Sequence, residues 1–240
     1  MNNAAPAVLF DLDGTLVDPA GGITGGVSHA LSVLGLPVPP ADVLASMVGP
    51  KLSDSLAALT EAQEHQIPEL IAIYRQWYAE HGIAMSRVYP GMAELLAGLQ
   101  SASVPLAVAT QKPQTLARTV LAHHGLDGFF GTIAGSPDDE TLRPGDAGYR
   151  SGKAEIIAAA LAGLGLERPG AAPAVMVGDR SHDVHGAAAN QLGCIGVAWG
   201  FAAPGELEAA GATAVVHSAP ELLAQLSLPV PLKETAHGTL

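Results

Sequence analysis

From residue 90 onward, short β-rich runs alternate with longer helical runs. Strands are expected at residues 106–109, 132–134, 174–177, 195–198 and 214–216. Helices are expected at residues 92–100, 114–124, 154–164, 183–192, 206–210 and 221–226. Strands that are separated by helices of this length favour a parallel sheet with helices on both faces. The sequence therefore predicts an α/β fold of the Rossmann-like type.

One further strand is expected before this alternating part of the chain. The apolar run at residues 6–10 ends in Asp11-Leu12-Asp13-Gly14-Thr15, which is typical of a buried strand followed by a loop. The stretch that follows has helical spacing and no clear strand, with helices expected at residues 21–36, 41–48, 52–59 and 68–81. We therefore predict a helical domain at residues 19–85, inserted into a core domain of residues 1–18 and 86–228. The polar residues 229–240 are predicted to form a loose tail.

Composition excludes several classes of protein. With 48% apolar and only 14% charged residues over 240 positions, the chain is too apolar to be disordered and long enough to bury a core. The net charge of −12 repels a nucleic-acid backbone, so no nucleic-acid partner is expected. The single cysteine, Cys194, excludes an intramolecular disulfide, and its apolar neighbours indicate a core position.

No run of 18 apolar residues is present, so no membrane-spanning helix is expected. The N-terminus lacks the basic region of a signal peptide. A cytoplasmic location without membrane partners is the resulting expectation.

Polar side chains follow three of the expected strands. Asp11 and Asp13 follow the first, Thr110-Gln111-Lys112-Pro113 follows the second, and Gly178-Asp179-Arg180 follows the fourth, with Asp183 close behind. Open parallel sheets carry their ligand sites at the carboxyl ends of the strands. These side chains are therefore expected to meet in one small mouth.

The residue types in this mouth suit phosphate chemistry. Several carboxylates that share one site repel each other unless a cation is present, and oxygen-only ligands suit Mg²⁺. Lys153, Thr110 and the amides of the helix start near Pro113 could hold an anion. A carboxylate beside the metal can attack a phosphoryl group and form an acyl-phosphate. A second carboxylate two positions on can protonate the leaving oxygen and later activate water.

Taken in order, these segments resemble the four motifs of the haloacid dehalogenase superfamily. The motifs are Asp11-Leu12-Asp13-Gly14-Thr15, Thr110, Lys153 and Gly178-Asp179-Arg180-Ser181-His182-Asp183, and the resemblance extends to about residue 226. It implies a sheet of that superfamily's type, with the helical insertion acting as a small cap over the substrate. It also implies Asp11 as the nucleophile, Asp13 as the general acid and base, and Lys153 as a third catalytic residue.

The resemblance further implies a metal site and a substrate site. Mg²⁺ is expected on the Asp11 carboxylate, the Asp13 backbone carbonyl and Asp179, with Asp183 in support. Thr110 and Lys153 are expected to bind the phosphoryl group that is transferred. The other candidate substrate-binding residues are Gly14, Lys51, Gln111, Lys112 and Arg180.

Asp13 favours phosphoryl transfer, because true dehalogenases lack this second carboxylate. The segments Val48-Gly49-Pro50-Lys51-Leu52 and Tyr89-Pro90-Gly91 are similar to the branch of phosphoglycolate phosphatases and bacterial 5′-nucleotidases. That branch usually has Ser-Lys after the strand-end threonine, whereas Gln111 replaces the serine here.

The expected function is Mg²⁺-dependent hydrolysis of a small phosphomonoester such as phosphoglycolate, by a monomer or homodimer. A 5′-nucleotidase acting on nucleoside monophosphates is the main alternative. A sugar phosphomutase remains open, because it uses the same aspartyl-phosphate. A receiver-like phosphoacceptor module is a further alternative. Receivers, however, are about half this length, and they lack both the helical insertion and an acid two residues after the phosphorylated aspartate.

Overall fold

The computed structural model describes residues 6–19, 21–139, 142, 145–150, 152–166 and 174–226. Six strands form one sheet in the order β5-β4-β1-β6-β7-β8, and all of its pairings are parallel. They are β1 (Ala7–Phe10), β4 (Leu106–Pro113), β5 (Thr132–Ser136), β6 (Ala174–Gly178), β7 (Gly193–Val197) and β8 (Ala214–Val216). The chain extends the sheet from β1 to one side through β4 and β5, and then crosses to β6 on the other side. In sheets of this kind a ligand crevice forms at the carboxyl end of such a switch point.

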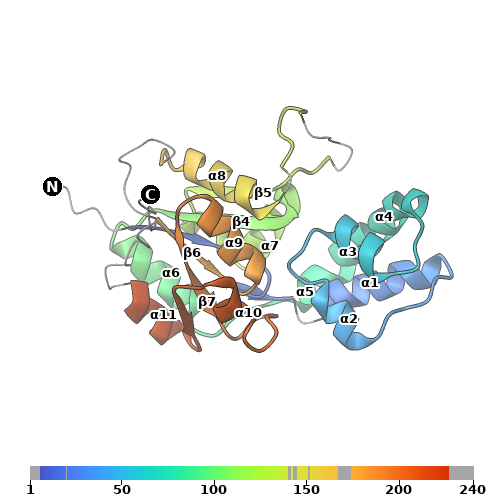
Figure 1. Ribbon diagram of the computed structural model, residues 1–240, viewed down its shortest axis with the longest axis horizontal. Helices are drawn as coiled ribbons and strands as arrows, with labels where there is room; N and C mark the ends of the chain where they lie inside the picture. Colours follow the sequence, from blue (N-terminus) through green and yellow to red (C-terminus); the bar gives the residue numbers. More distant parts are fainter. Residues whose placement is uncertain are drawn as a thin grey trace, which may run out of the picture.

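Helices cover both faces of this sheet, as predicted (Figure 1). Val8 and Phe10 of β1 belong to one apolar core, while Leu9 between them belongs to the other, because successive strand residues point to opposite faces. The first core includes residues of α6 (Met92–Ser101), α7 (Gln114–His123) and α11 (Ala219–Leu226). The second includes residues of α8 (Lys153–Gly163), α9 (Ser181–Ala189) and α10 (Glu206–Ala210). The predicted core residue Cys194 is buried in this second core.

The segment between β1 and α6 forms a separate group of helices beside the sheet (Figure 1). It contains α1 (Gly22–Val33), α2 (Ala41–Ser46), α3 (Leu52–Leu59), η1 (Glu64–Gln66), α4 (Ile67–Trp77), the π-helix η2 (Tyr78–Gly82) and α5 (Ile83–Met85). We call residues 22–85 the helical block, and the sheet with α6–α11 the α/β body. Two chain segments connect them, and they pair as the antiparallel strands β2 (Val17–Asp18) and β3 (Arg87–Val88).

Several element boundaries differ from the prediction. β4 continues beyond Ala109 to Pro113, because its pairing with β5 resumes at Ser136 after an irregularity in register. Thr110, Gln111 and Lys112 therefore lie on a bulged strand end and not on a loop. α9 starts at Ser181, two residues earlier than expected, and η3 (Asp127–Phe129) was not predicted. The predicted tail, 229–240, lies outside the described residues. None of the described helices is long and apolar enough to cross a membrane.

Candidate active site

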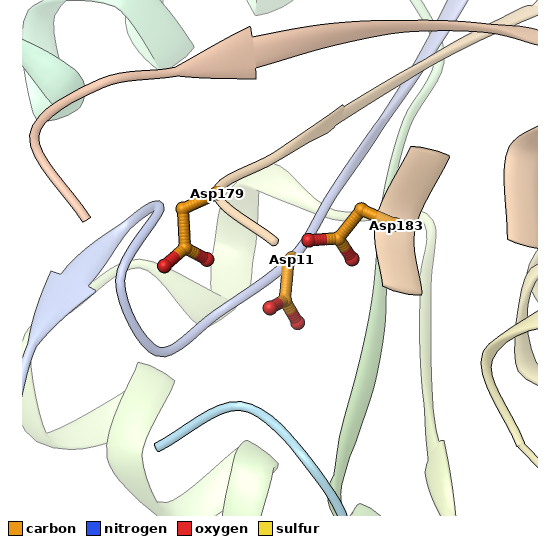
Figure 2. A group of neighbouring side chains, drawn as sticks. All are labelled: Asp11, Asp179 and Asp183. Atoms are coloured by element: carbon orange, nitrogen blue, oxygen red, sulfur yellow. The ribbon is translucent and has the colours of Figure 1, made fainter. Parts of the chain in front are cut away.

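Three buried carboxylates meet at the carboxyl end of the sheet (Figure 2). Asp11 follows β1 directly, Asp179 follows β6 directly, and Asp183 lies in the first turn of α9. Each of the three offers an oxygen, and these oxygens lie within 4.8 Å of one another. The predicted convergence of these side chains is therefore what the structure shows. We call Asp11, Asp179 and Asp183 the acid cluster.

The orientation of Asp179 is fixed by the backbone around it. Its Oδ2 accepts a hydrogen bond of 2.8 Å from the Phe201 amide, and its Oδ1 accepts one of 3.3 Å from Thr15 Oγ1. Gly14 packs directly against this carboxylate, and a Cβ at Gly14 would lie 2.2 Å from Asp179 Oδ2. Gly14 also has a φ of 87°, which glycine adopts readily. The expected substrate-binding residue Gly14 thus serves in this structure to admit the Asp179 carboxylate.

Asp183 both belongs to the acid cluster and caps α9. Its Oδ2 accepts a hydrogen bond of 3.0 Å from the Arg180 amide at the start of that helix. A carboxylate in the first helical turn is also favoured by the helix dipole. The helix start therefore fixes the direction of the Asp183 side chain.

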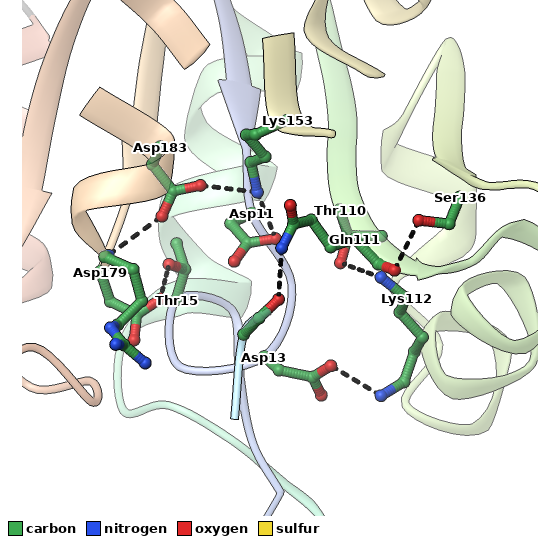
Figure 3. Close-up of polar contacts among 12 residues, drawn as sticks. Asp11, Asp13, Thr15, Thr110, Gln111, Lys112, Ser136, Lys153, Asp179 and Asp183 are labelled. Atoms are coloured by element: carbon green, nitrogen blue, oxygen red, sulfur yellow. Dashed lines mark hydrogen bonds and ion pairs between the residues drawn. The ribbon is translucent and has the colours of Figure 1, made fainter. Parts of the chain in front are cut away.

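Lys153, the first residue of α8, supplies the positive charge beside the acid cluster. Its Nζ lies 2.8 Å from Asp11 Oδ1 and 2.6 Å from Asp183 Oδ1 (Figure 3). Burial lowers the pKa of Lys153, but the two carboxylates raise it more, so its pKa is above the ordinary value. Lys153 therefore stays charged and bridges Asp11 and Asp183 within the acid cluster.

One ammonium does not neutralise three carboxylates. Burial and the nearby charge of Asp11 together raise the pKa of Asp183 to about 6, although Lys153 opposes them. Burial and the charges of Asp183 and Asp11 raise the pKa of Asp179 well above its usual range. Such shifts mark carboxylates whose ionised forms lack sufficient positive charge nearby. The buried, oxygen-only donor set fits a hard divalent cation.

The Asp13 carboxylate points away from the acid cluster. Its Oδ2 forms an ion pair of 2.6 Å with Lys112 Nζ, and both side chains are buried (Figure 3). The Lys112 ammonium also lies 4.8 Å from the ring centroid of Tyr78, which comes from the π-helix of the helical block. Burial raises the pKa of Asp13, although Lys112 opposes this. Asp13 Oδ1 makes no hydrogen bond in the described part of the chain.

The bulged end of β4 presents the remaining polar groups. Thr110 is buried, and its Oγ1 accepts a hydrogen bond of 3.2 Å from the Lys112 amide. Ser136 Oγ on the neighbouring strand donates to the Gln111 carbonyl at 2.7 Å. These bonds fix the backbone where β4 departs from regular pairing.

A pocket lies beside Asp13, between the helical block and the α/β body. Its polar and charged lining residues are Asp13, Lys51, Tyr74, Arg75, Gln111, Lys112 and Ser136. Ile23, Met47, Leu52 and Leu116 add apolar surface. The expected substrate residues Lys51, Gln111 and Lys112 therefore line one pocket. Arg180 does not line it, since Arg180 contacts Glu206 and the Val48 carbonyl instead.

Several residues of the site had no assigned role from sequence. Thr15 belongs to the first motif, and its position there is the only signal that could have identified it. The Phe201 amide carries no side-chain signal, so its bond to Asp179 is visible only in the structure. Tyr78 is buried, and its ring contacts the Lys112 ammonium, which nothing in the sequence indicated.

Residues 8–197 match the family of haloacid dehalogenase-like hydrolases. The chain belongs to this family. The predicted family membership and fold class are thus confirmed. A 5′-nucleotidase from Pseudomonas aeruginosa is 38% identical over 204 residues, which cover 85% of this chain and 87% of that protein. Phosphoglycolate phosphatases match as well, one from Cupriavidus necator at 31% identity over 92% of this chain and 93% of its own length.

Two further similarities bear on the function. A protein named tyrosine-protein kinase PtkA, from Mycobacterium tuberculosis, is 41% identical over 212 residues, or 88% of this chain and 68% of that protein. The crystal structure of a predicted phosphatase from Clostridium acetobutylicum is 35% identical, with a TM-score of 0.82 over 93% of this chain and 98% of that one. The kinase name was not among the functions expected from sequence.

Proposed function

We propose that this hydrolase cleaves a small phosphomonoester with the help of Mg²⁺, through an aspartyl-phosphate on Asp11. Two distinct acidic groups lie together at the carboxyl end of the sheet, and this placement is the main support for the proposal. The acid cluster has spare negative charge for a metal, and Asp13 lies beside it with its own lysine. The names of the phosphatase and nucleotidase relatives support the same class of reaction.

The carboxylates of Asp11, Asp179 and Asp183, with the Asp13 backbone carbonyl, would hold Mg²⁺. When bound, the ion supplies positive charge that offsets the repulsion between the Asp11 carboxylate and an incoming phosphoryl group. Lys153 contributes a second positive charge through its contacts with Asp11 Oδ1 and Asp183 Oδ1.

Asp11 attacks phosphorus, and the bond between phosphorus and the ester oxygen breaks. Asp13 gives its proton to that leaving oxygen, for which its unbonded Oδ1 is available. Asp13 then takes a proton from water as the water attacks the aspartyl-phosphate, which releases phosphate and restores Asp11. Thr110 and Lys153 bind the phosphoryl oxygens during both steps.

The pocket beside Asp13 receives the leaving group. We propose that residues 19–85 act as the cap over this pocket, on a core of residues 1–18 and 86–228. Phosphoglycolate is the first candidate substrate, and nucleoside monophosphates are the alternative that the nucleotidase relative supports. The kinase relative makes phosphoryl transfer involving a protein tyrosine a second candidate function.

The test is phosphate release from phosphoglycolate, nucleoside monophosphates, sugar phosphates and a phosphotyrosine peptide, each with Mg²⁺ and with chelator. We expect one small ester to be preferred, with activity that requires Mg²⁺ and disappears in Asp11→Asn. Asp127→Asn, which changes an exposed aspartate far along the chain, is the matched control. Wild-type turnover by Asp11→Asn would overturn the assignment of the nucleophile. A parallel assay with ATP and a tyrosine peptide tests the kinase alternative, which phosphoryl transfer without ester hydrolysis would favour.

A further inference from the structure

One loop of the helical block is tied to the α/β body through its backbone. This loop, residues 47–51, connects α2 to α3 and lies at the pocket. Arg180 Nη1 donates a hydrogen bond of 2.8 Å to the Val48 carbonyl, and Gln111 Nε2 donates one of 3.1 Å to the Gly49 carbonyl. Because both acceptors are backbone carbonyls, these bonds fix where the loop lies whatever its side chains are. We call Arg180 and Gln111 the loop clamp.

Both residues of the loop clamp are themselves held by the α/β body. Arg180 Nε lies 3.1 Å from Glu206 Oε1, and the same carboxylate accepts hydrogen bonds from the amides of Ser181 at 2.8 Å and Ala203 at 3.0 Å. Although burial opposes it, these bonds lower the pKa of Glu206 to about 2. Glu206 is therefore ionised at neutral pH and orients the Arg180 side chain. The Gln111 backbone is anchored by Ser136.

The two donors come from the two halves of the candidate site. Arg180 directly follows Asp179 of the acid cluster, and Gln111 lies between Thr110 and Lys112 at the end of β4. Gly49, in the loop that the two donors hold, has a φ of +104°, and a Cβ there would lie 3.3 Å from Arg180 Cγ. The loop can therefore turn at Gly49 while staying close to Arg180.

We infer that Arg180 and Gln111 are positioning residues, which hold the 47–51 loop so that Lys51 faces the leaving group. Lys51 lines the pocket with Asp13 and Lys112, and its side chain has no ion-pair partner among the described residues. A clamped Lys51 therefore offers an unpaired positive charge to a negatively charged leaving group. This inference rests on the proposed hydrolysis, and it replaces the expectation that Arg180 and Gln111 bind the substrate themselves.

Hydrogen exchange tests the loop clamp without reference to activity. The experiment compares amide exchange in wild-type protein, Arg180→Ala, Arg180→Lys and Gln111→Met, all with Mg²⁺. We expect exchange at residues 47–51 to accelerate by about fivefold in Gln111→Met and about tenfold in Arg180→Ala, since charged donors form stronger bonds. Arg180→Lys keeps a positive charge, but its single ammonium cannot replace the guanidinium contacts with both Glu206 and the Val48 carbonyl. Exchange at residues 47–51 in this variant should therefore fall between wild type and Arg180→Ala.

The matched control for exchange is Gln100→Met. Gln100 Nε2 donates to the Gly128 carbonyl at 3.1 Å, which is the same kind of bond at an exposed place in the α/β body. This control should leave exchange at residues 47–51 as in wild type. Unchanged exchange there in both Gln111→Met and Arg180→Ala would overturn the loop clamp.

Kinetics then test what the loop clamp positions. Lys51→Met, Gln111→Met and the double variant are compared on phosphoglycolate, whose leaving group carries a carboxylate already in the bound ester, and on p-nitrophenyl phosphate, whose leaving group carries none. We expect the loss of kcat/KM on phosphoglycolate to exceed that on p-nitrophenyl phosphate by about fivefold in each variant. The double variant should lose no more kcat/KM on phosphoglycolate than Lys51→Met alone, because Gln111 acts only by positioning Lys51.

Additive losses in the double variant would mean that Gln111 acts independently of Lys51, which would overturn the inference. Equal losses on both esters would do the same. If wild-type protein hydrolyses neither ester, the proposed function fails, whereas the exchange result still decides whether the loop clamp exists.

Discussion

Two buried lysines lie near the carboxyl end of β1, and they contact different numbers of carboxylates. Lys153 contacts Asp11 and Asp183, and Asp179 adds a third carboxylate to the same cluster. Lys112 pairs with Asp13 alone. The first group is left with excess negative charge when ionised, whereas the second is neutral by itself. Only the first group therefore calls for a metal ion, which would separate the proposed metal site from the proposed acid and base.

The two groups also differ in what surrounds them. The acid cluster is held by backbone amides of the α/β body, at Phe201 and Arg180. The Lys112–Asp13 pair lies against Tyr78 of the helical block. The acid cluster thus depends on one part of the molecule, whereas the Lys112–Asp13 pair also contacts the other part.

After the loss of the nucleophile in Asp11→Asn, the largest expected effect is that of Asp13→Asn. Loss of the general acid should lower kcat by about 10²–10⁴-fold. The change also leaves the buried Lys112 ammonium without its partner, which should cost about 3 kcal/mol in the free energy of unfolding. Urea unfolding and steady-state kinetics measure the two effects.

The double variant Asp13→Asn/Lys112→Met sharpens this result. Removing the unpaired ammonium should recover most of the lost stability without recovering kcat. Recovery of activity in the double variant would contradict the role of Asp13 in proton transfer.

Lys153→Met should lower kcat by about 10²–10³-fold, because a donor to the phosphoryl oxygens is lost. It should also tighten Mg²⁺ binding, because the same variant removes the only lysine that contacts the acid cluster among the described residues. Titration calorimetry measures the dissociation constant. Weaker Mg²⁺ binding would show that Lys153 organises the cluster more than it competes with the metal.

Metal removal should expose the charge imbalance of the acid cluster. The pKa of Asp183 is raised to about 6 and that of Asp179 is also raised, so both bind protons more tightly in the folded than in the unfolded chain. Metal-free protein should therefore lose stability as pH rises from about 4 through 6. Mg²⁺ at about 100 times its dissociation constant should raise the free energy of unfolding by about 2.7 kcal/mol at pH 8, and by less at pH 5.

Asp179→Asn provides the comparison for this measurement. With one carboxylate fewer, the metal-free variant should melt above metal-free wild type at pH 8, and Mg²⁺ should raise its melting temperature less. Thermal melts with chelator and with Mg²⁺ at both pH values measure this. An equal Mg²⁺ shift in the two proteins would place the ion away from Asp179.

The acid cluster was predictable because its placement depends on topology alone. Parallel strands deliver the residues that follow them to one edge, so Asp11 and Asp179 were expected at the same edge of the sheet once the alternating pattern was recognised, and the pairing of β1 with β6 then brings them together. The resemblance to the family then identified Lys153. The order of the strands was not predicted, since the sequence pattern does not say on which side of β1 each strand adds.

The surroundings of Asp13 were less predictable. Lys112 reaches Asp13 from a strand end that continues past Ala109 with an irregular register, and nothing in the local sequence signals that extension. Arg180 was expected at the substrate, but its partner Glu206 lies 26 residues away along the chain. Such pairings depend on how distant segments pack, and residue spacing does not reveal them.

The smallest expected effect concerns Tyr78, through which the helical block contacts the Lys112–Asp13 pair. Tyr78→Phe keeps an aromatic face beside the Lys112 ammonium, so the free energy of unfolding should stay within about 1 kcal/mol of wild type. Tyr78→Leu loses that face, and its kcat should fall several-fold below that of Tyr78→Phe. Urea unfolding and steady-state kinetics on both variants measure this difference. Equal kcat values would show that Lys112 holds Asp13 without help from the helical block. The Lys112–Asp13 pair would then depend on the helical block no more than the acid cluster does.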